Sequence, residues 1–423
     1  MRFNTLIGCK NICIFVLALA CGLLPQLGYT NTAPPLTLKD AIAQTLAQNP
    51  RLYQYRFVND AFKARQQTDA LLPPLELEFE VENFAGSDSF KGLDSAEATL
   101  TLSSVIEMGR KRKARISLMD ARMHTAQWEQ EAATLDILGE LTRVYIEGLA
   151  SQANIALAKD SLSLSNAILN TVKIRVARGA TPEAEALRAQ AAVTQAEIRL
   201  AALLSKFERQ RIMLARFWGE THPKFSQLSG NLFEFGTTES FEQLYARVKN
   251  SPSVQVFASH ARLKDAEVTL ARASGRSDVT WRAGVRRFED TGDSALTAGF
   301  SIPLFSKKRN KGDVKAALAE RNAVDYAKHD ALLRLRTKLF EAYSLYQQNI
   351  DAVNHTKNTV LPALEKALLL TNLAYEKGRY QYLDLVAAQK ELLASKQALI
   401  DSAANALVSQ ALIEQLTNEA LSQ

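Results

Sequence analysis

Segments of the N-terminal half of this chain recur in its C-terminal half at a nearly constant spacing. Residues 38–50 resemble 241–252, residues 102–112 resemble 300–309, and residues 176–190 resemble 375–389. All three pairs are offset by about 200 residues, and self-similarity at a fixed spacing is the signature of a duplicated unit. We therefore expect two repeats of one unit, residues 34–230 and residues 231–423.

Each repeat contains a long segment with a helical pattern. No proline occurs between Lys111 and Arg178, and apolar residues recur three and four positions apart, as they do from Leu135 to Leu149. A helix of this extent would be on the order of 100 Å long, so it must pack as an antiparallel coiled coil. The second repeat has the same pattern from Lys315 to Lys377, and Pro362 should kink or restart that helix. Turns are expected near residues 179 and 378, each followed by a further helix.

Alternating patterns precede both long helices. From Leu75 to Glu82 apolar and acidic residues alternate strictly, and the segment 96–102 alternates after a Gly-, Ser- and Asp-rich loop. A period of two is typical of β-strands. The second repeat offers comparable runs at 279–286 and 296–302. We predict strand hairpins at about 74–107 and 278–305, with strands of about 8 to 11 residues, the length that crosses a tilted bilayer.

The first residues have the pattern of a secretory signal peptide. Arg2 and Lys10 precede a short apolar run, so residues 1–33 are predicted to be removed on export. All cysteines, Cys9, Cys13 and Cys21, lie in this segment, and the exported protein would contain none. Lipidation of Cys21 is an alternative. No later apolar run is long enough to span a bilayer as a helix, so membrane insertion would use the strands.

Four strands cannot close a transmembrane barrel, because about eight is the smallest common size. Closure would therefore require an oligomer, and three chains would give a 12-stranded barrel. We expect an α+β membrane protein in which a coiled-coil helical barrel continues into this trimeric β-barrel. A soluble sheet that caps a helical body is the alternative.

Composition gives no support for catalysis or nucleic-acid binding. The formal charge is +6, without a Lys/Arg stripe interleaved with aromatic residues. The five histidines are scattered without metal-ligand spacing. We expect no enzyme activity, no cofactor and no resident metal.

The alternation also predicts a charged lumen. If the apolar residues of the strands face lipid, the intervening charged residues face the interior: Glu76, Glu78, Glu80, Glu82, Glu97, Arg282 and Arg286. Five acids against two bases would favour cations over anions. In the alternative reading these acids only solvate the barrel interior and pair with the arginines.

Several segments resemble the TolC-like family of outer-membrane efflux proteins: residues 108–115, 359–362, 374–379 and 384–389. They are most similar to its heavy-metal branch, that of the cobalt-zinc-cadmium resistance component. The resemblance implies a homotrimer in the outer membrane with a helical tunnel in the periplasm. It also implies a periplasmic adaptor and an inner-membrane pump, of the resistance-nodulation-division type, as partners. One departure is Val105 and Ile106, where the second repeat has the more usual Pro303 and Leu304.

The resemblance further implies functional residues at the ends of the long helices. Glu185 and Asp384 match the acidic positions near the periplasmic constriction, and we expect them to form a gate. The exposed turn residues expected to face the adaptor are Arg178, Gly179, Lys377, Gly378 and Arg379. Drugs, small organic solutes or a polypeptide are alternative cargoes to metal ions, and a periplasmic coiled-coil adaptor is the alternative class of protein.

Overall fold

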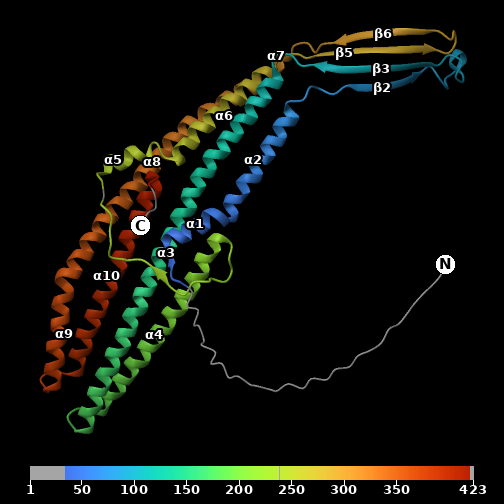
Figure 1. Ribbon diagram of the computed structural model, residues 1–423. Coiled ribbons are helices and arrows are strands. Elements are labelled where there is room, and N and C mark those ends of the chain that lie inside the picture. The colour runs from blue at the N-terminus through green and yellow to red at the C-terminus, as the bar shows by residue number, and fades with distance from the viewer. Residues whose placement is uncertain (1–33, 238, 420–423) are drawn as a thin grey trace, which may run out of the picture. The chain divides into compact units, whose positions relative to one another are not determined.

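The computed structural model describes residues 34–237 and 239–419 (Figure 1). The predicted signal peptide, with Cys9, Cys13 and Cys21, lies outside these described residues. In chain order the α-helices are α1 (Leu38–Gln48), α2 (Pro50–Asp69), α3 (Lys111–Ala177), α4 (Glu183–Ala215), α5 (Phe241–Val248), α6 (Pro252–Ser274), α7 (Ser306–Arg309), α8 (Lys311–His355), α9 (Leu361–Glu376) and α10 (Tyr382–Thr417). The strands are β1 (Leu36–Thr37), β2 (Glu76–Glu82), β3 (Glu97–Ile106), β4 (Leu228–Ser229), β5 (Val279–Phe288) and β6 (Ser294–Ser301). Short 3₁₀ turns lie at Asp88–Phe90 and Arg216–Trp218.

The four longer strands form one antiparallel sheet in the order β2-β3-β5-β6. The two hairpins, β2-β3 and β5-β6, are joined by pairing between β3 and β5, whose residues lie far apart in the sequence. Glu97 is opposite Phe288 and Ile106 is opposite Val279 at the two ends of that pairing. As a result β2 and β6 are the two edge strands, and they run antiparallel to each other.

The longest helix, α3, runs without interruption for 67 residues, where the proline-free pattern predicts a helix. Its counterpart in the C-terminal half is broken. A π-helical turn (Thr356–Val360) separates α8 from α9, and Pro362 lies in the first turn of α9. Proline has no N–H and its ring clashes with the carbonyl group four residues earlier, so a local widening of the helix accommodates it. The predicted effect of Pro362 is thus confirmed.

The long helices pack along one another. Helix α3 contacts α4, α6, α2 and α10, and helix α8 contacts α10 and α6. In Figure 1 the α3–α4 pair and the α9–α10 pair each end in a tight turn. None of the helices within the described ranges combines the length and apolar composition that a membrane-spanning helix requires.

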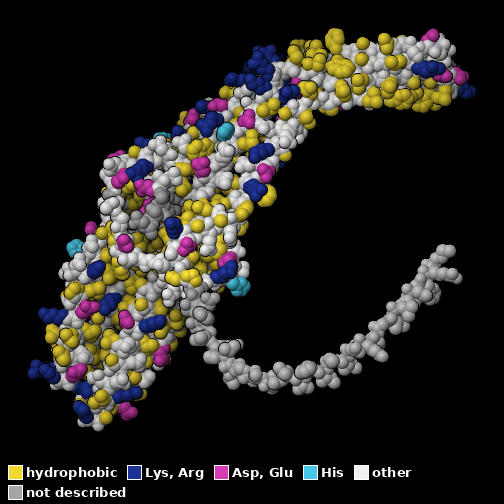
Figure 2. Space-filling view, viewed as in Figure 1, with side chains coloured by type: hydrophobic (Ala, Val, Ile, Leu, Met, Phe, Trp, Pro, Cys, Tyr) yellow, Lys and Arg dark blue, Asp and Glu magenta, His cyan; other side chains and the backbone are white. Residues whose placement is uncertain are grey.

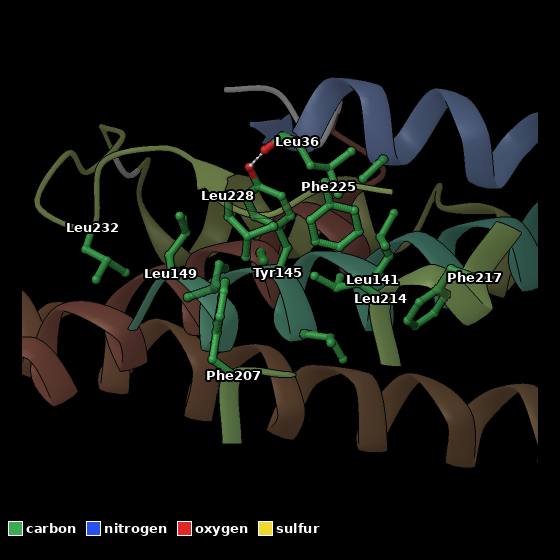
Figure 3. Close-up of a cluster of buried hydrophobic side chains, with 14 of the residues drawn as sticks. Leu36, Leu141, Tyr145, Leu149, Phe207, Leu214, Phe217, Phe225, Leu228 and Leu232 are labelled. Atoms are coloured by element: carbon green, nitrogen blue, oxygen red, sulfur yellow. Dashed lines mark hydrogen bonds between the residues drawn. The ribbon is translucent and has the colours of Figure 1, made fainter. Parts of the chain in front are cut away.

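The main hydrophobic core surrounds Tyr145 of α3 (Figure 3). Its hydroxyl group lies 2.7 Å from the carbonyl oxygen of Leu36 and 2.6 Å from that of Ser229. Leu36 and Ser229 belong to β1 and β4, which pair in parallel. The phenol therefore fixes this small sheet to the middle of α3. Burial raises the pKa of Tyr145 to about 12.

Candidate functional site

The sheet has one polar and one apolar face. Directly paired residues share a face of a sheet, so the register decides which side chains lie together. On one face, each glutamate of β2 is opposite a polar residue of β3, as Glu78 is to Thr101 and Glu82 is to Glu97. The same face continues across β5 and β6 through Arg282 and Arg286, which are paired with Gly299 and Ala295. All seven charged residues predicted for the lumen therefore lie on one face.

The opposite face is apolar and exposed. The strands contribute to it mainly large hydrophobic side chains: Leu77, Phe79, Val81, Leu100, Leu102, Ile106, Trp281, Val285, Leu296 and Phe300. Leu296 is 87% exposed and Phe300 is 75% exposed. Soluble monomeric proteins rarely expose a contiguous apolar patch of this kind. A face of this composition requires an apolar environment or partner.

Arg286 links three strands on the polar face. Its Nη1 donates to the Glu97 carboxylate at 2.7 Å, its Nη2 to Glu82 at 3.1 Å, and its Nε to the Thr99 hydroxyl group at 3.0 Å. A guanidinium group can bind two carboxylates in this way because its donors lie in one rigid plane. Asn83 adds a hydrogen bond of 3.0 Å to Glu97. Arg286 thus offsets one of the two negative charges of Glu82 and Glu97 at the loop end of the sheet.

The other charged residues of this face are free. Within the described part of the chain, the side chains of Glu76, Glu78, Glu80 and Arg282 make no ion pair or hydrogen bond, and all four residues are exposed. The pairing expected in the alternative reading therefore applies to Glu82 and Glu97 only. Five carboxylates against two guanidinium groups leave the face with an excess of negative charge.

The helical ends carry two turns of the same construction. Gly179 and Gly378 have positive φ angles of 69° and 73°, the left-handed conformation that glycine adopts without strain. Each is the second residue after a helix end, following the C-cap residue. The residue after each glycine donates its N–H to a carbonyl group five residues earlier: Ala180 to Arg175, and Arg379 to Ala374, both at 2.9 Å. Arg178, Gly179, Lys377, Gly378 and Arg379 are all exposed in these turns.

Glu185 and Asp384 occupy matching places just after the turns, but their contacts differ. Asp384 is exposed and accepts a hydrogen bond of 2.8 Å from the backbone N–H of Gln381, which caps α10. Glu185 is half-buried and accepts hydrogen bonds from Thr181 and, at 3.2 Å, from the hydroxyl group of Tyr375. Burial, followed by the negative charge of Glu185, raises the pKa of Tyr375 to about 12.

Arg175 was not predicted from the sequence. Its guanidinium group binds the carbonyl oxygens of Tyr375 and Glu376 and lies 4.6 Å from the centre of the Tyr375 ring. It therefore joins the end of α3 to the end of α9. In the expected repeat alignment Arg175 corresponds to Ala374 and Tyr375 to Val176, so the alignment gave no signal for this contact.

No group of three or more His, Cys, Asp and Glu side chains within residues 34–237 and 239–419 is arranged to hold a metal ion. The arrangement instead offers a sheet with opposed faces and helical turns with exposed charges.

A family model described as "Outer membrane efflux protein" matches residues 41–220 and 244–419, which is most of the chain. The chain belongs to this family. It is an outer-membrane efflux protein, and its helical part lies in the periplasm. This assignment favours the efflux channel over the alternative of a periplasmic adaptor.

Known relatives of this efflux protein include metal-resistance components. It is 26% identical over 367 residues to the cobalt-zinc-cadmium resistance protein CzcC of Cupriavidus metallidurans, covering 86% of this chain and 85% of the relative. It is 28% identical over 310 residues to the nickel-cobalt-cadmium resistance protein NccC of Alcaligenes xylosoxydans xylosoxydans, covering 71% and 67%. Among solved structures, the transmembrane channel protein CusC matches with a TM-score of 0.76 at 15% identity, over 94% of this chain and 96% of that one. The predicted resemblance is confirmed, and the efflux protein has the fold of these channels.

Proposed function

We propose that three copies of this efflux protein close their sheets into a 12-stranded barrel that conducts heavy-metal cations out of the cell. The observation that carries the proposal is the separation of the sheet into an exposed apolar face and an acidic face. An apolar face suits lipid, and a polar face suits a water-filled lumen.

The sheet edges support closure by several chains. Both β2 and β6 lack a partner on their outer side among the described strands. Because β2 and β6 run antiparallel, β6 of one chain can pair with β2 of the next without breaking the antiparallel order. Unpaired strand edges are unfavourable in a membrane, which gives a reason for the ring to close. The duplicated sequence would give this trimer six similar helical hairpins.

We propose that the free carboxylates select the ions. With Glu82 and Glu97 bound to Arg286, the unpaired acids are Glu76, Glu78 and Glu80 on β2, and three chains would place rings of these carboxylates in the lumen. Rings of carboxylates attract cations and repel anions. Metal ions are the proposed cargo because CzcC and NccC are named for resistance to such ions.

The helical turns are the proposed partner and gate region. Arg178, Gly179, Lys377, Gly378 and Arg379 would face a periplasmic adaptor, which connects the channel to an inner-membrane pump of the resistance-nodulation-division type. Glu185 and Asp384 would form a ring of carboxylates at the constriction, where like-charge repulsion favours opening or cation binding. The exposed position of the Asp384 carboxylate is compatible with this role.

Ion selectivity in planar bilayers tests the lumen. Replacing Glu76, Glu78 and Glu80 with Gln should shift the reversal potential under a salt gradient toward that of a non-selective pore. The matched control replaces the same three residues with Asp, which keeps the charge and should keep the selectivity. An unchanged reversal potential in the Gln variant would refute the proposed role.

The gate and the cargo need separate measurements. The double variant Glu185→Ala, Asp384→Ala removes the repulsion that favours opening, so it should lower the conductance of the closed channel, while Glu183→Ala at the same end should not change it. Equal closed-state conductance in the wild-type protein and both variants would show that the gate is elsewhere.

The cargo is tested in cells that depend on this channel. These cells should lose tolerance to cobalt, zinc or cadmium when the channel is deleted, and unchanged metal tolerance would favour organic solutes.

A further inference from the structure

Seven exposed cationic residues gather where the sheet meets the helices. They come from the start of α3 and from α7 and the start of α8, and we call them the basic collar: Arg110, Arg112, Lys113, Lys307, Lys308, Arg309 and Lys311. Figure 2 shows dark blue Lys and Arg side chains beside the yellow hydrophobic ones at this junction, near α7 of Figure 1. The two parts of the collar are the two basic runs of the duplicated sequence.

The side chains of the collar have no partner within the described part of the chain. Two nearby acids are already used: Glu107 binds Arg115 through both oxygens, at 2.5 and 3.0 Å, and Asp278 binds Lys111 at 2.6 Å. Asp313, in the first turn of α8, makes no ion pair within the described residues, so one free negative charge stands against the seven cations of the collar. Asp278 also accepts a hydrogen bond of 2.9 Å from the backbone of Met108. Structural ion pairs therefore hold the junction together, and the collar is left as surplus positive charge.

Exposed apolar residues lie directly beside the collar. On the first chain segment these are Ile106 and Met108, which are 52% and 47% exposed, just before Arg110. On the second segment Leu304 and Phe305, 72% and 77% exposed, come just before Lys307. Cations next to exposed apolar side chains are typical of a membrane interface, where the long side chains reach the headgroups.

The opposite end of the sheet has the reverse charge. The loops there carry mainly acidic residues: Asp88, Asp94, Glu289, Asp290 and Asp293, against Lys91. Arg287 adds a positive charge at the adjoining end of β5. The positive charge is thus specific to the helical end. If the sheet crosses the outer membrane as proposed, with the helical part in the periplasm, the collar would lie at the level of the inner leaflet.

We propose that the basic collar binds the phosphate groups of anionic glycerophospholipids in this inner leaflet. The phosphodiester headgroups would accept hydrogen bonds from the lysine and arginine side chains, while the acyl chains cover Leu304, Phe305 and the apolar face. The inference rests on the proposed function, in that the sheet is inserted in the outer membrane, and is independent of the cargo. A row of cations facing solvent on a soluble helix would need no anionic partner, but in the proposed barrel the exposed apolar residues beside it would face lipid.

Trp281 provides a local probe. It lies on the apolar face near the start of β5, opposite Phe300, whereas Trp218 is buried in the helical part and Trp128 lies within α3. The purified full-length protein is reconstituted with lipids brominated in the acyl chain, and quenching of Trp281 is compared between phosphatidylglycerol and phosphatidylcholine. We expect phosphatidylglycerol to be preferred at least about threefold at low salt, with a weaker preference at high salt.

The variant Arg112→Gln, Lys113→Gln, Lys307→Gln, Lys308→Gln should lose this preference. A matched control removes the same charge from exposed, unpaired lysines on α8, the π-helical turn and α9 (Lys328, Lys338, Lys357 and Lys366, each to Gln) and should keep the preference. A charge-conserving exchange of Lys and Arg at the four collar positions should also keep it. Equal quenching by the two lipids in the wild-type protein, or a preference that survives in the collar variant, would overturn the proposal. Should the collar variant fail to fold, the salt dependence of the wild-type preference still decides.

Discussion

The Arg286 guanidinium group on β5 lies 2.7 Å from a carboxylate oxygen of Glu97 on β3, although the two residues are 189 positions apart in the sequence. This contact joins the two hairpins on the face that we assign to the lumen.

Removing Arg286 should change selectivity more than stability. The side chains of Arg286 and Glu97 are 31% and 21% exposed, and pairs of this exposure contribute about 1 kcal/mol or less. The variant Arg286→Gln should therefore unfold within a few degrees of the wild-type protein, but two more free carboxylates should make the channel more selective for cations. Reversal potentials measure the effect. Arg287→Gln, on the other face, is the control, and a shift of equal size in that variant would contradict the assigned faces.

Tyr145→Phe should destabilise the helical part. The change removes the hydroxyl group that binds both Leu36 and Ser229, and it leaves their carbonyl oxygens without that donor. The expected loss in the free energy of unfolding is about 1–3 kcal/mol. Thermal unfolding followed by circular dichroism measures it. Tyr53→Phe, at a side chain that is 49% exposed, should cost nothing measurable.

The Tyr375 phenol should lose its stabilising effect only at strongly alkaline pH. Its pKa is raised from 10.0 to about 12, so its contribution to stability is complete below pH 10 and is lost as the pH rises toward 12. The difference in phenolate absorbance between the wild-type protein and Tyr375→Phe reports its titration. Because Glu185 is the second cause of the shift, Glu185→Gln should lower this pKa, and Glu183→Gln should not. A titration of Tyr375 near pH 10 in the wild-type protein would contradict the described contact.

Alanine in place of Gly179 or Gly378 should destabilise each turn by about 1 kcal/mol, because both residues have positive φ angles. A methyl group would meet no atom within 4 Å at Gly179, and at Gly378 only the end of the Arg175 side chain at 3.8 Å, so the cost comes from the backbone. Gly312→Ala is the control. Gly312 lies in α8 with open space around it and no positive φ angle, and alanine there should stabilise the helix by about 0.5–1 kcal/mol. The unfolding temperature should fall for Gly179→Ala and Gly378→Ala and rise for Gly312→Ala.

The sequence predicts the features that depend on local periodicity. The alternating segment Leu75–Glu82 contains strand β2. The segment Lys111–Arg178, which has a helical period and no proline, contains the long helix α3. The contacts between distant segments were not predictable in this way. The pairing of β3 with β5, the position of Tyr145 between β1 and β4, and the reach of Arg175 to the end of α9 all depend on how the helices pack. A short strand such as β1, with two residues, also has too few positions to show a period.

The break before Pro362 makes the two long arms of the chain mechanically unequal. Helix α3 keeps its hydrogen-bond ladder along its whole length, whereas the α8–α9 arm includes the π-helical turn at Thr356–Val360 and then a proline. Bending concentrates where the ladder is irregular. A force applied at the turns would therefore bend the α8–α9 arm more than α3. The end of α9 would move relative to the end of α3, which stays in place.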